Sequence, residues 1–201
     1  MTSRLVVFIS GNGSNLQAIL DACKSGELDA VVASVVSNKA DAYGLTRAKN
    51  SDIEAIHFAK QENESRQDYD ARLADYASTC LPDYIILAGW MRILTSAFLN
   101  HFPNRVINIH PALPNTFPGT HAIERAYQAY QRGEITQTGV MIHLVPDEGV
   151  DDGPLLAKQE INFIQNESLE DFENRIDQTE HQLLVNTLTT IVTSNPKNET
   201  I

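Results

Sequence analysis

Residues 4–20 read RLVVFISGNGSNLQAIL and place a strand, a glycine turn and a helix start in one stretch. The apolar run from Leu5 to Ile9 predicts a buried strand, and the glycines within Gly11 to Ser14 predict a tight turn. The residues that follow repeat at helical spacing, so a helix is predicted whose apolar face carries Leu16, Ile19, Leu20 and Cys23. Strand, turn and helix in this order begin an α/β fold.

The same alternation continues to residue 109. Further strands are predicted over 31–36, 54–57, 84–88 and 106–109, with helices over 42–49 and after a cap at Ser65. Such an order implies an α/β protein with a mainly parallel, Rossmann-like sheet and helices on both faces. Because functional groups in these sheets gather at the carboxyl ends of the strands, the residues just after each strand are the candidates for a site.

The remaining chain predicts a helix over 122–130, strands over 140–145 and 157–161, and a long helix capped by Ser168. An acidic, glycine-containing loop over 147–154 lies between the two strands. The inward face of the long helix is predicted to carry Phe172, Ile176, Leu183, Leu188 and Ile191.

Charge and composition restrict the kinds of partner. The chain has 201 residues and a formal net charge of −11. A surface that acidic repels the phosphates of nucleic acid, so we expect no DNA or RNA partner. The apolar run at Leu5–Ile9 is too short for a signal sequence or a membrane span, so we expect a cytoplasmic protein without membrane association. Cys23 and Cys80 are expected to be buried free thiols.

The glycine turn is the first candidate binding site. Its backbone and the helix start that follows can offer N–H groups to an anion, from Gly11, Asn12, Gly13, Ser14 and Asn15. The alternative is a plain glycine turn with Ser14 or Asn15 as the helix cap. A dinucleotide fingerprint needs a third small residue where Leu16 stands, and the P-loop ending is absent, so the predicted ligand is a phosphomonoester.

The strand ending Asn108-Ile109-His110-Pro111 is the second candidate site. An asparagine in a buried strand is disfavoured unless its amide is used, and His110 lies where a parallel sheet presents catalytic groups. The alternative is a core asparagine with satisfied hydrogen bonds beside an ordinary loop histidine.

Together with Phe117-Pro118-Gly119, this segment resembles the formyltransferase family. The resemblance extends over Ser10–Asn15, Ser37–Lys39, Ala88–Leu94, Thr138-Gly139 and Asp147–Asp151, and covers about Leu5 to Ile191. It implies transfer of the formyl group of 10-formyltetrahydrofolate to the amine of glycinamide ribonucleotide, a step of purine synthesis. It also implies a formyltransferase-type sheet with a late antiparallel strand. Residues 1–201 would form one domain, with a phosphate-binding half at 1–100, a catalytic and folate half at 101–192, and a flexible tail at 193–201.

The resemblance implies a role for each catalytic residue. His110 would be the general acid and oxyanion partner, Asn108 the amide donor to the same oxygen, and Asp151 the carboxylate that pairs with His110 and raises its pKa. No covalent intermediate and no metal would be needed. Asp147, Glu148 and Asp152 are interpreted as a solvated turn.

The resemblance also implies ligand contacts. Met91, Arg92, Ile93 and Leu94, with Asn108, would bind the folate, and Arg66 would meet anionic groups of cofactor or substrate; packing of the segment on the sheet and an exposed arginine without a role are the alternatives. Glu180 would contact the substrate ribose, against the alternative of a polar helix face. Four further histidines are interpreted as structural: His57, His101, His121 and His143.

Two departures from the family pattern border the site. Ala112-Leu113-Pro114-Asn115-Thr116 stands where many relatives have Ser-Leu-Leu-Pro and a basic residue, and Asp152 stands where a small residue is common. Both leave loop geometry open. Rival functions are formylation of methionyl-tRNA, hydrolysis of formyl-folate, and a non-catalytic anion-binding module. The first rival carries an extra carboxyl-terminal domain and the second an extra amino-terminal one, neither of which we expect here. A homodimer is possible.

Overall fold

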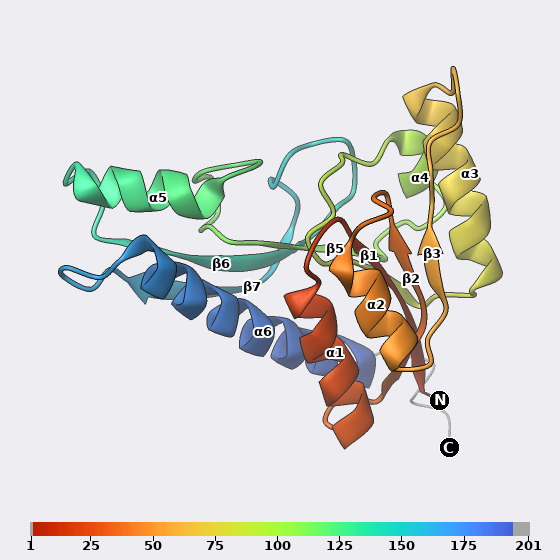
Figure 1. Cartoon of the computed structure of the whole chain (residues 1–201), viewed down its shortest axis with the longest axis horizontal. Helices are drawn as coiled ribbons and strands as arrows, with labels where there is room; N and C mark the ends of the chain where they lie inside the picture. The colour runs from red at the N-terminus through yellow and green to blue at the C-terminus, as the bar shows by residue number, and fades with distance from the viewer. Residues whose placement is uncertain (1, 195–201) are drawn as a thin grey trace.

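The computed structural model describes residues 2–194 and contains one seven-stranded sheet in the order β3-β2-β1-β4-β5-β6-β7 (Figure 1). β1 to β5 pair in parallel, whereas β6 and β7 are antiparallel to their neighbours. The strands are β1 (Ser3–Ile9), β2 (Ala30–Ser37), β3 (Ala55–His57), β4 (Tyr84–Leu87), β5 (Val106–His110), β6 (Gln137–Leu144) and β7 (Leu155–Asn162). The predicted mainly parallel sheet with an antiparallel late strand is confirmed, and the antiparallel part comprises both late strands.

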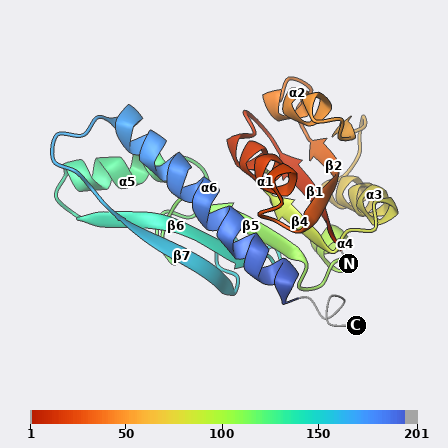
Figure 2. The same cartoon turned by 90° about the horizontal axis from the view of Figure 1, so that it is seen from below.

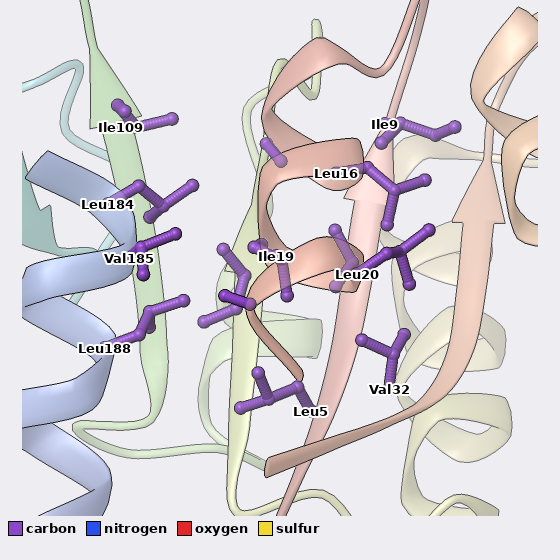
Figure 3. Close-up of a cluster of buried hydrophobic side chains, with 14 of the residues drawn as sticks. Leu5, Ile9, Leu16, Ile19, Leu20, Val32, Ile109, Leu184, Val185 and Leu188 are labelled. Carbon is purple, nitrogen blue, oxygen red and sulfur yellow. The ribbon is translucent and has the colours of Figure 1, made fainter. Parts of the chain in front are cut away.

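Helices cover the two faces of this sheet (Figure 2). The helices are α1 (Ser14–Ser25), α2 (Tyr43–Asn50), α3 (Arg66–Thr79), α4 (Ser96–Leu99), α5 (Ala122–Gln131) and α6 (Leu169–Thr193). One core cluster joins α1, α2 and α6 to the sheet, with Leu16, Ile19 and Leu184 fully buried (Figure 3). A second cluster packs α3 and α4 on the other face. At about 25 cal/mol per Å² of apolar area, these two interfaces are the main stabilising contribution.

Local sequence explains where the main helices start. Ser65 and Ser168 precede α3 and α6, and each side chain accepts a hydrogen bond from the backbone N–H three residues on, at Asp68 and Asp171. α1 starts differently, because Gly13 is its N-cap residue with a left-handed φ of 76° and no side chain caps the helix. The first turn of α1 therefore lacks a side-chain cap for its N–H groups.

Several sequence predictions need correction. The short helix α4 was not predicted, and β6 begins at Gln137 rather than at residue 140. In α6 the fully buried positions are Leu184 and Val192, whereas Leu183 and Ile191 are only partly buried against the core. α6 also continues to Thr193, inside the stretch predicted as a flexible tail, and residues 195–201 lie outside the described part.

Both cysteines are free, and Cys80 is buried while Cys23 is half-buried. Burial raises the pKa of Cys23 to about 11, which keeps it in the unreactive thiol form. Within residues 2–194, no helix has the length and apolar character needed to cross a membrane.

Candidate active site

A cleft of about 590 Å³ opens where the carboxyl ends of β4 and β5 meet the start of α1. It brings together many of the residues singled out in the sequence: Asn15, Met91, Arg92, Ile93, Leu94, Asn108, His110, Asp151 and Glu180. Arg66 and residues 11–14 are not among its lining residues, although they adjoin lining residues in the chain or in space. Its position is the one that a parallel sheet predicts.

Asn108 and His110 are held by β5, and Asp151 joins them from the loop before β7. The Nδ1 atom of His110 lies 3.3 Å from Oδ2 of Asp151, and the amide of Asn108 donates to the other carboxylate oxygen at 3.1 Å. Side chains two residues apart on a strand share one face, so Asn108 and His110 reach the same carboxylate. The predicted pairing of His110 with Asp151 is present in the structure.

Asp151 is placed by an unusual backbone and a backbone donor. Its φ is 55°, in the left-handed region that aspartate and asparagine tolerate better than most residues. The N–H of Gly119 donates to its Oδ2 at 2.7 Å. Burial alone would raise the pKa of Asp151, but the hydrogen bonds from His143 and Gly119 and the charge of His110 bring that pKa below its ordinary value. The carboxyl group is therefore ionised at neutral pH.

His143 belongs to this network, so its interpretation as a structural histidine is wrong. It lies directly opposite Asn108 in the antiparallel pairing of β5 with β6. Its Nδ1 faces the carbonyl oxygen of Leu144 at 2.8 Å, which requires a proton on Nδ1, so the neutral ring presents Nε2 as an acceptor. Nε2 is 3.1 Å from the Asn108 amide nitrogen and 3.6 Å from Asp151.

The expected rise in the pKa of His110 is not the net result. The ring is 4% exposed, and this burial lowers its pKa below the ordinary value. The charge of Asp151 and the carbonyl oxygen of Phe117, which lies 3.0 Å from Nε2, act in the opposite direction but do not outweigh burial. Asp151 therefore has the expected sign of effect, against a larger cost of desolvating the charged ring.

The loop between β5 and α5 carries strain next to His110. Phe117 has a φ of 46°, which is rare for a residue with a large side chain. Its carbonyl oxygen faces His110 and also accepts a hydrogen bond from Arg125 at 2.7 Å. Within the departure at 112–116, Ala112 is fully buried and Asn115 also has a positive φ. This loop thus aims the Phe117 carbonyl at His110 despite its altered sequence.

The glycine turn keeps the features of an anion site. The alternative of Ser14 or Asn15 as the cap of α1 is excluded, because Gly13 holds that position without a side-chain hydrogen bond. Packing also explains Gly13, since a Cβ there would lie 2.8 Å from the Cα of Gly44 in α2. Arg47 of α2 fixes the turn from the side, by donating to the backbone and side-chain oxygens of Asn12 at 2.9 and 2.8 Å.

Glu180 is not on a polar helix face. It is 7% exposed, lines the cleft, and its Oε2 accepts a hydrogen bond from the amide of Asn15 at 3.3 Å. Burial raises the pKa of Glu180 to about 7, so the protonated form is well populated at neutral pH. The Oδ1 atom of Asn15 is buried beside it without a hydrogen-bond partner. A buried acid and a buried amide oxygen without partners are prepared to meet a polar ligand.

The segment Met91–Leu94 is fastened at both ends. The backbone N–H of Met91 donates to Ser10 at 2.8 Å, and that of Thr95 donates to the buried carboxylate of Asp70 at 2.6 Å. Met91 and Ile93 remain exposed at 61% and 44%. The sequence analysis did not select Ser10 or Asp70, although a buried acid on the apolar face of a helix is a detectable signal.

Arg66 has partners within the protein. It donates to the carbonyl oxygen of Ile93 at 2.9 Å and lies 3.7 Å from Glu148. Glu148 also accepts a hydrogen bond from the backbone of Ser96, so its interpretation as part of a solvated turn is wrong, whereas Asp152 is exposed. Among the residues that the structure describes, no three His, Cys, Asp or Glu side chains form a group suited to a metal ion.

A sheet of this topology, with an Asn-His-Asp group at the carboxyl end of β5, defines the class to which the chain belongs. The sequence matches the model of the formyl transferase family over residues 3–188, and the chain belongs to that family. The expectation of a formyltransferase enzyme is thereby confirmed.

Named relatives narrow this class. The chain is 43% identical to a phosphoribosylglycinamide formyltransferase of Dictyostelium discoideum, over 94% of this chain and 97% of that relative. It is 40% identical to the Escherichia coli protein of the same name, over 89% of this chain and 82% of that relative. The crystal structure of glycinamide ribonucleotide transformylase 1 from Geobacillus kaustophilus superimposes with a TM-score of 0.88 at 36% identity, over 95% of this chain and 99% of that one.

Proposed function

We propose that the cleft transfers the formyl group of 10-formyltetrahydrofolate to the glycinamide amine of glycinamide ribonucleotide, giving formylglycinamide ribonucleotide and tetrahydrofolate in purine synthesis. The observation that carries this proposal is the hydrogen-bonded group of Asn108, His110 and Asp151 in one cleft with Asn15 and Met91–Leu94. The first of these elements suits acyl transfer, the second adjoins the glycine turn, and the third offers apolar side chains to a flat ring.

The chemistry is the formation of one C–N bond and the cleavage of another. The glycinamide nitrogen attacks the formyl carbon, the carbonyl oxygen gains negative charge, and the bond to the folate nitrogen then breaks as that nitrogen receives a proton. The protein must supply donors to the oxygen and a proton to the leaving nitrogen. Asn108 and His110 are the groups that can do this from one face of β5.

Both donors are engaged in the structure. The amide nitrogen of Asn108 faces His143 and Asp151, and Nε2 of His110 faces the carbonyl of Phe117. Each must exchange one such partner for the formyl oxygen or the leaving nitrogen. For His110, retention of the Asp151 contact at 3.3 Å keeps the ring oriented during this exchange.

The acceptor substrate fits beside α1. Its phosphate would take the uncapped N–H groups that follow Gly13 and the hydroxyl of Ser14, where the helix dipole favours an anion. A sugar hydroxyl would meet Glu180 and the unpartnered Oδ1 of Asn15. Both groups are buried, so an unmatched ligand would leave them without hydrogen bonds at a cost of about 1–3 kcal/mol each.

The formyl donor fits the other side of the cleft. Met91 and Ile93 expose apolar side chains at its lining, together with Val150. Arg66, tied to the Ile93 carbonyl, is proposed to attract the acidic groups of the donor's tail. The partners required are two small molecules, and a homodimer is compatible because every residue of the site comes from one chain.

The compartment and the domain organisation are parts of this proposal. Two free cysteines fit a reducing compartment, and we assign the enzyme to the cytoplasm. Residues 1–201 act as one domain, because a single core cluster joins β1 and α1 of the phosphate-binding half to β6 and α6 of the half at 101–192.

The test offers the purified protein 10-formyltetrahydrofolate with three alternative acceptors: glycinamide ribonucleotide, water and methionyl-tRNA. Tetrahydrofolate formation is followed spectroscopically, and the formylated product is identified by mass spectrometry. Formyl transfer to glycinamide ribonucleotide alone is expected, and it should be lost in His110→Ala but kept in the control His57→Ala, a change of the same kind at an exposed position.

Other outcomes point to the rival functions. Formate release without an acceptor would identify a formyl-folate hydrolase, and formylation of methionyl-tRNA would identify a tRNA-modifying enzyme. Phosphate binding that persists without any transfer, and that is insensitive to changes at Asn108 and His110, would leave an anion-binding module.

A further inference from the structure

β7 (Leu155–Asn162) forms one edge of the sheet, and it is far longer than the three-residue strand β3 at the other edge (Figures 1 and 2). Of its eight residues, only Ile161 is buried. Leu155, Leu156 and the nearby Ile164 are exposed at 47%, 38% and 53%. An edge strand of this length with apolar neighbours is a template for pairing with another strand.

The backbone of β7 presents its even-numbered residues to the outside. The N–H of Phe163 donates to Thr136, just beyond β6, so the backbone groups of the odd-numbered residues face β6. Two outward carbonyls reveal the opposite set. The carbonyl oxygen of Asn162 accepts from the side chain of Arg175 at 2.9 Å, and that of Glu160 accepts from the side chain of Gln159 at 3.1 Å.

The charges along this edge are complementary to themselves. Lys158 and Glu160 point to the same face of β7 and lie 3.1 Å apart. In an antiparallel pair of identical strands around a two-fold axis, the residue numbers of opposite partners have a constant, even sum. If Gln159 lies on the axis, Lys158 of each copy faces Glu160 of the other. If Lys158 or Glu160 lies on the axis, like charges face each other, so the charges select one register.

We propose that β7 pairs with β7 of a second copy of this chain, antiparallel and with Gln159 on the two-fold axis, to give one continuous sheet through a homodimer. In this register the N–H of Lys158 donates to the carbonyl of Glu160 in the partner copy, and the N–H of that Glu160 donates to the carbonyl of Lys158. The same pair repeats on the other side of the axis. The Gln159 side chain releases the Glu160 carbonyl, and the Lys158 N–H replaces it.

Two further features bear on this pairing. Leu156 lies opposite Asn162 of the partner copy in this register, which brings exposed apolar surface of the two edges together. The net charge of −11 on each copy opposes association, but this repulsion is screened beyond about 8 Å at physiological ionic strength. Residues 155–162 do not line the active-site cleft, so dimerisation leaves the proposed chemistry intact.

The test measures self-association of the full chain by sedimentation equilibrium from about 1 to about 500 µM, a range that spans typical weak homodimers. Glu160→Lys places lysine opposite lysine, and the dimer Kd should rise at least about tenfold. The double variant Lys158→Glu with Glu160→Lys restores opposite charges across the axis at unchanged net charge, and its Kd should return to within about threefold of wild type. Glu27→Lys, exposed in the turn before β2, is the control with the same change of charge.

Hydrogen exchange supplies a second readout. The amides of Lys158 and Glu160 should become protected as concentration rises through the Kd, while that of Gln159, which already faces β6, should not change. A chain that stays monomeric up to about 500 µM would overturn the proposal. So would a dimer whose Kd does not respond to Glu160→Lys, because its interface would lie elsewhere. Formyl transfer per chain should be the same in all four proteins, which separates this test from that of the function.

Discussion

Two regions of the cleft are built in opposite ways. The glycine turn is one continuous stretch, Gly11 to Asn15, whose useful groups are backbone N–H groups at the start of α1. The catalytic group is assembled from β5, β6 and the loop before β7, and its useful groups are side chains that hold one another: Asn108, His110, His143 and Asp151. Changes in the first region should therefore act locally on binding, whereas changes in the second should act on the rate and on neighbouring pKa values.

The largest effect is expected at His110. His110→Ala removes both an oxyanion partner and the proton donor, so the single-turnover rate should fall about 1000-fold or more. The Kd values of both substrates should change little, because the lost interactions strengthen only near the transition state. Rapid-quench transfer and equilibrium binding on the same preparation measure the two quantities, and circular dichroism checks the fold. A variant with near-normal turnover would refute the assignment of His110.

Asp151→Asn should have the next largest effect, about 100-fold on turnover, because one charge is lost while the shape is kept. Asparagine tolerates the positive φ of 55° at this position, so the backbone should be retained. The pKa of His110, already lowered by burial, should fall further without the nearby carboxylate. NMR titration of the imidazole gives this pKa directly. Asp152→Asn, at the exposed neighbour, is the control, and equal effects of the two variants would show that Asp151 is not the partner.

Glu180 allows a test through pH. The pKa of this buried acid is raised to about 7 in the folded protein, so the folded state binds the proton more tightly than the unfolded state does. The associated stability is present below the unfolded pKa and is lost as pH rises towards 7. Compared with wild type, Glu180→Gln should therefore gain about 2 kcal/mol in free energy of unfolding between pH 4.5 and 8. Urea unfolding of both proteins across this range measures the difference, with the exposed Glu62→Gln as control. A difference that does not vary with pH would contradict a raised pKa.

The smallest expected effect is at Ser14. Ser14→Ala removes one hydroxyl donor near the uncapped start of α1 and should weaken glycinamide ribonucleotide binding about tenfold. Folate binding should not change. Ser25→Ala, at the far end of the same helix, is the matched control. Isothermal titration with each substrate separates the two affinities, and equal losses for both would remove the phosphate role from the turn. Gly13→Val is a poorer test, because its Cβ would meet the Gly44 backbone and destabilise the fold.

The sequence predicted what depends on local pattern. The apolar strand at Leu5–Ile9, the turn after it, and the polar residues in the strand ending at His110 each carry their signal in a few adjacent positions. His143 is likewise a polar residue within an apolar strand, but its meaning depends on the register that sets it opposite Asn108. That antiparallel register follows from how the sheet closes, which no short stretch of sequence encodes.

Glu180 illustrates a signal that was present but overlooked. Phe172, Ile176, Leu184 and Leu188 are spaced by multiples of four along α6, and all are fully buried. Glu180 occupies the remaining place in this series, so the stripe itself marks the acid as buried. By contrast, the net lowering of the pKa of His110 could not be predicted, because it depends on how completely the loop around Phe117 covers the ring.

The central claim is that Asn108 and His110 act together on one developing oxyanion, and a double-mutant cycle in single-turnover transfer tests it most directly. Asn108→Ala, His110→Ala and the double variant are compared with wild type, with saturating 10-formyltetrahydrofolate and glycinamide ribonucleotide. The two residues share one carboxylate partner, so the double variant should lose clearly less than the product of the single losses. Losses that multiply would show that the two residues act independently and would contradict the account.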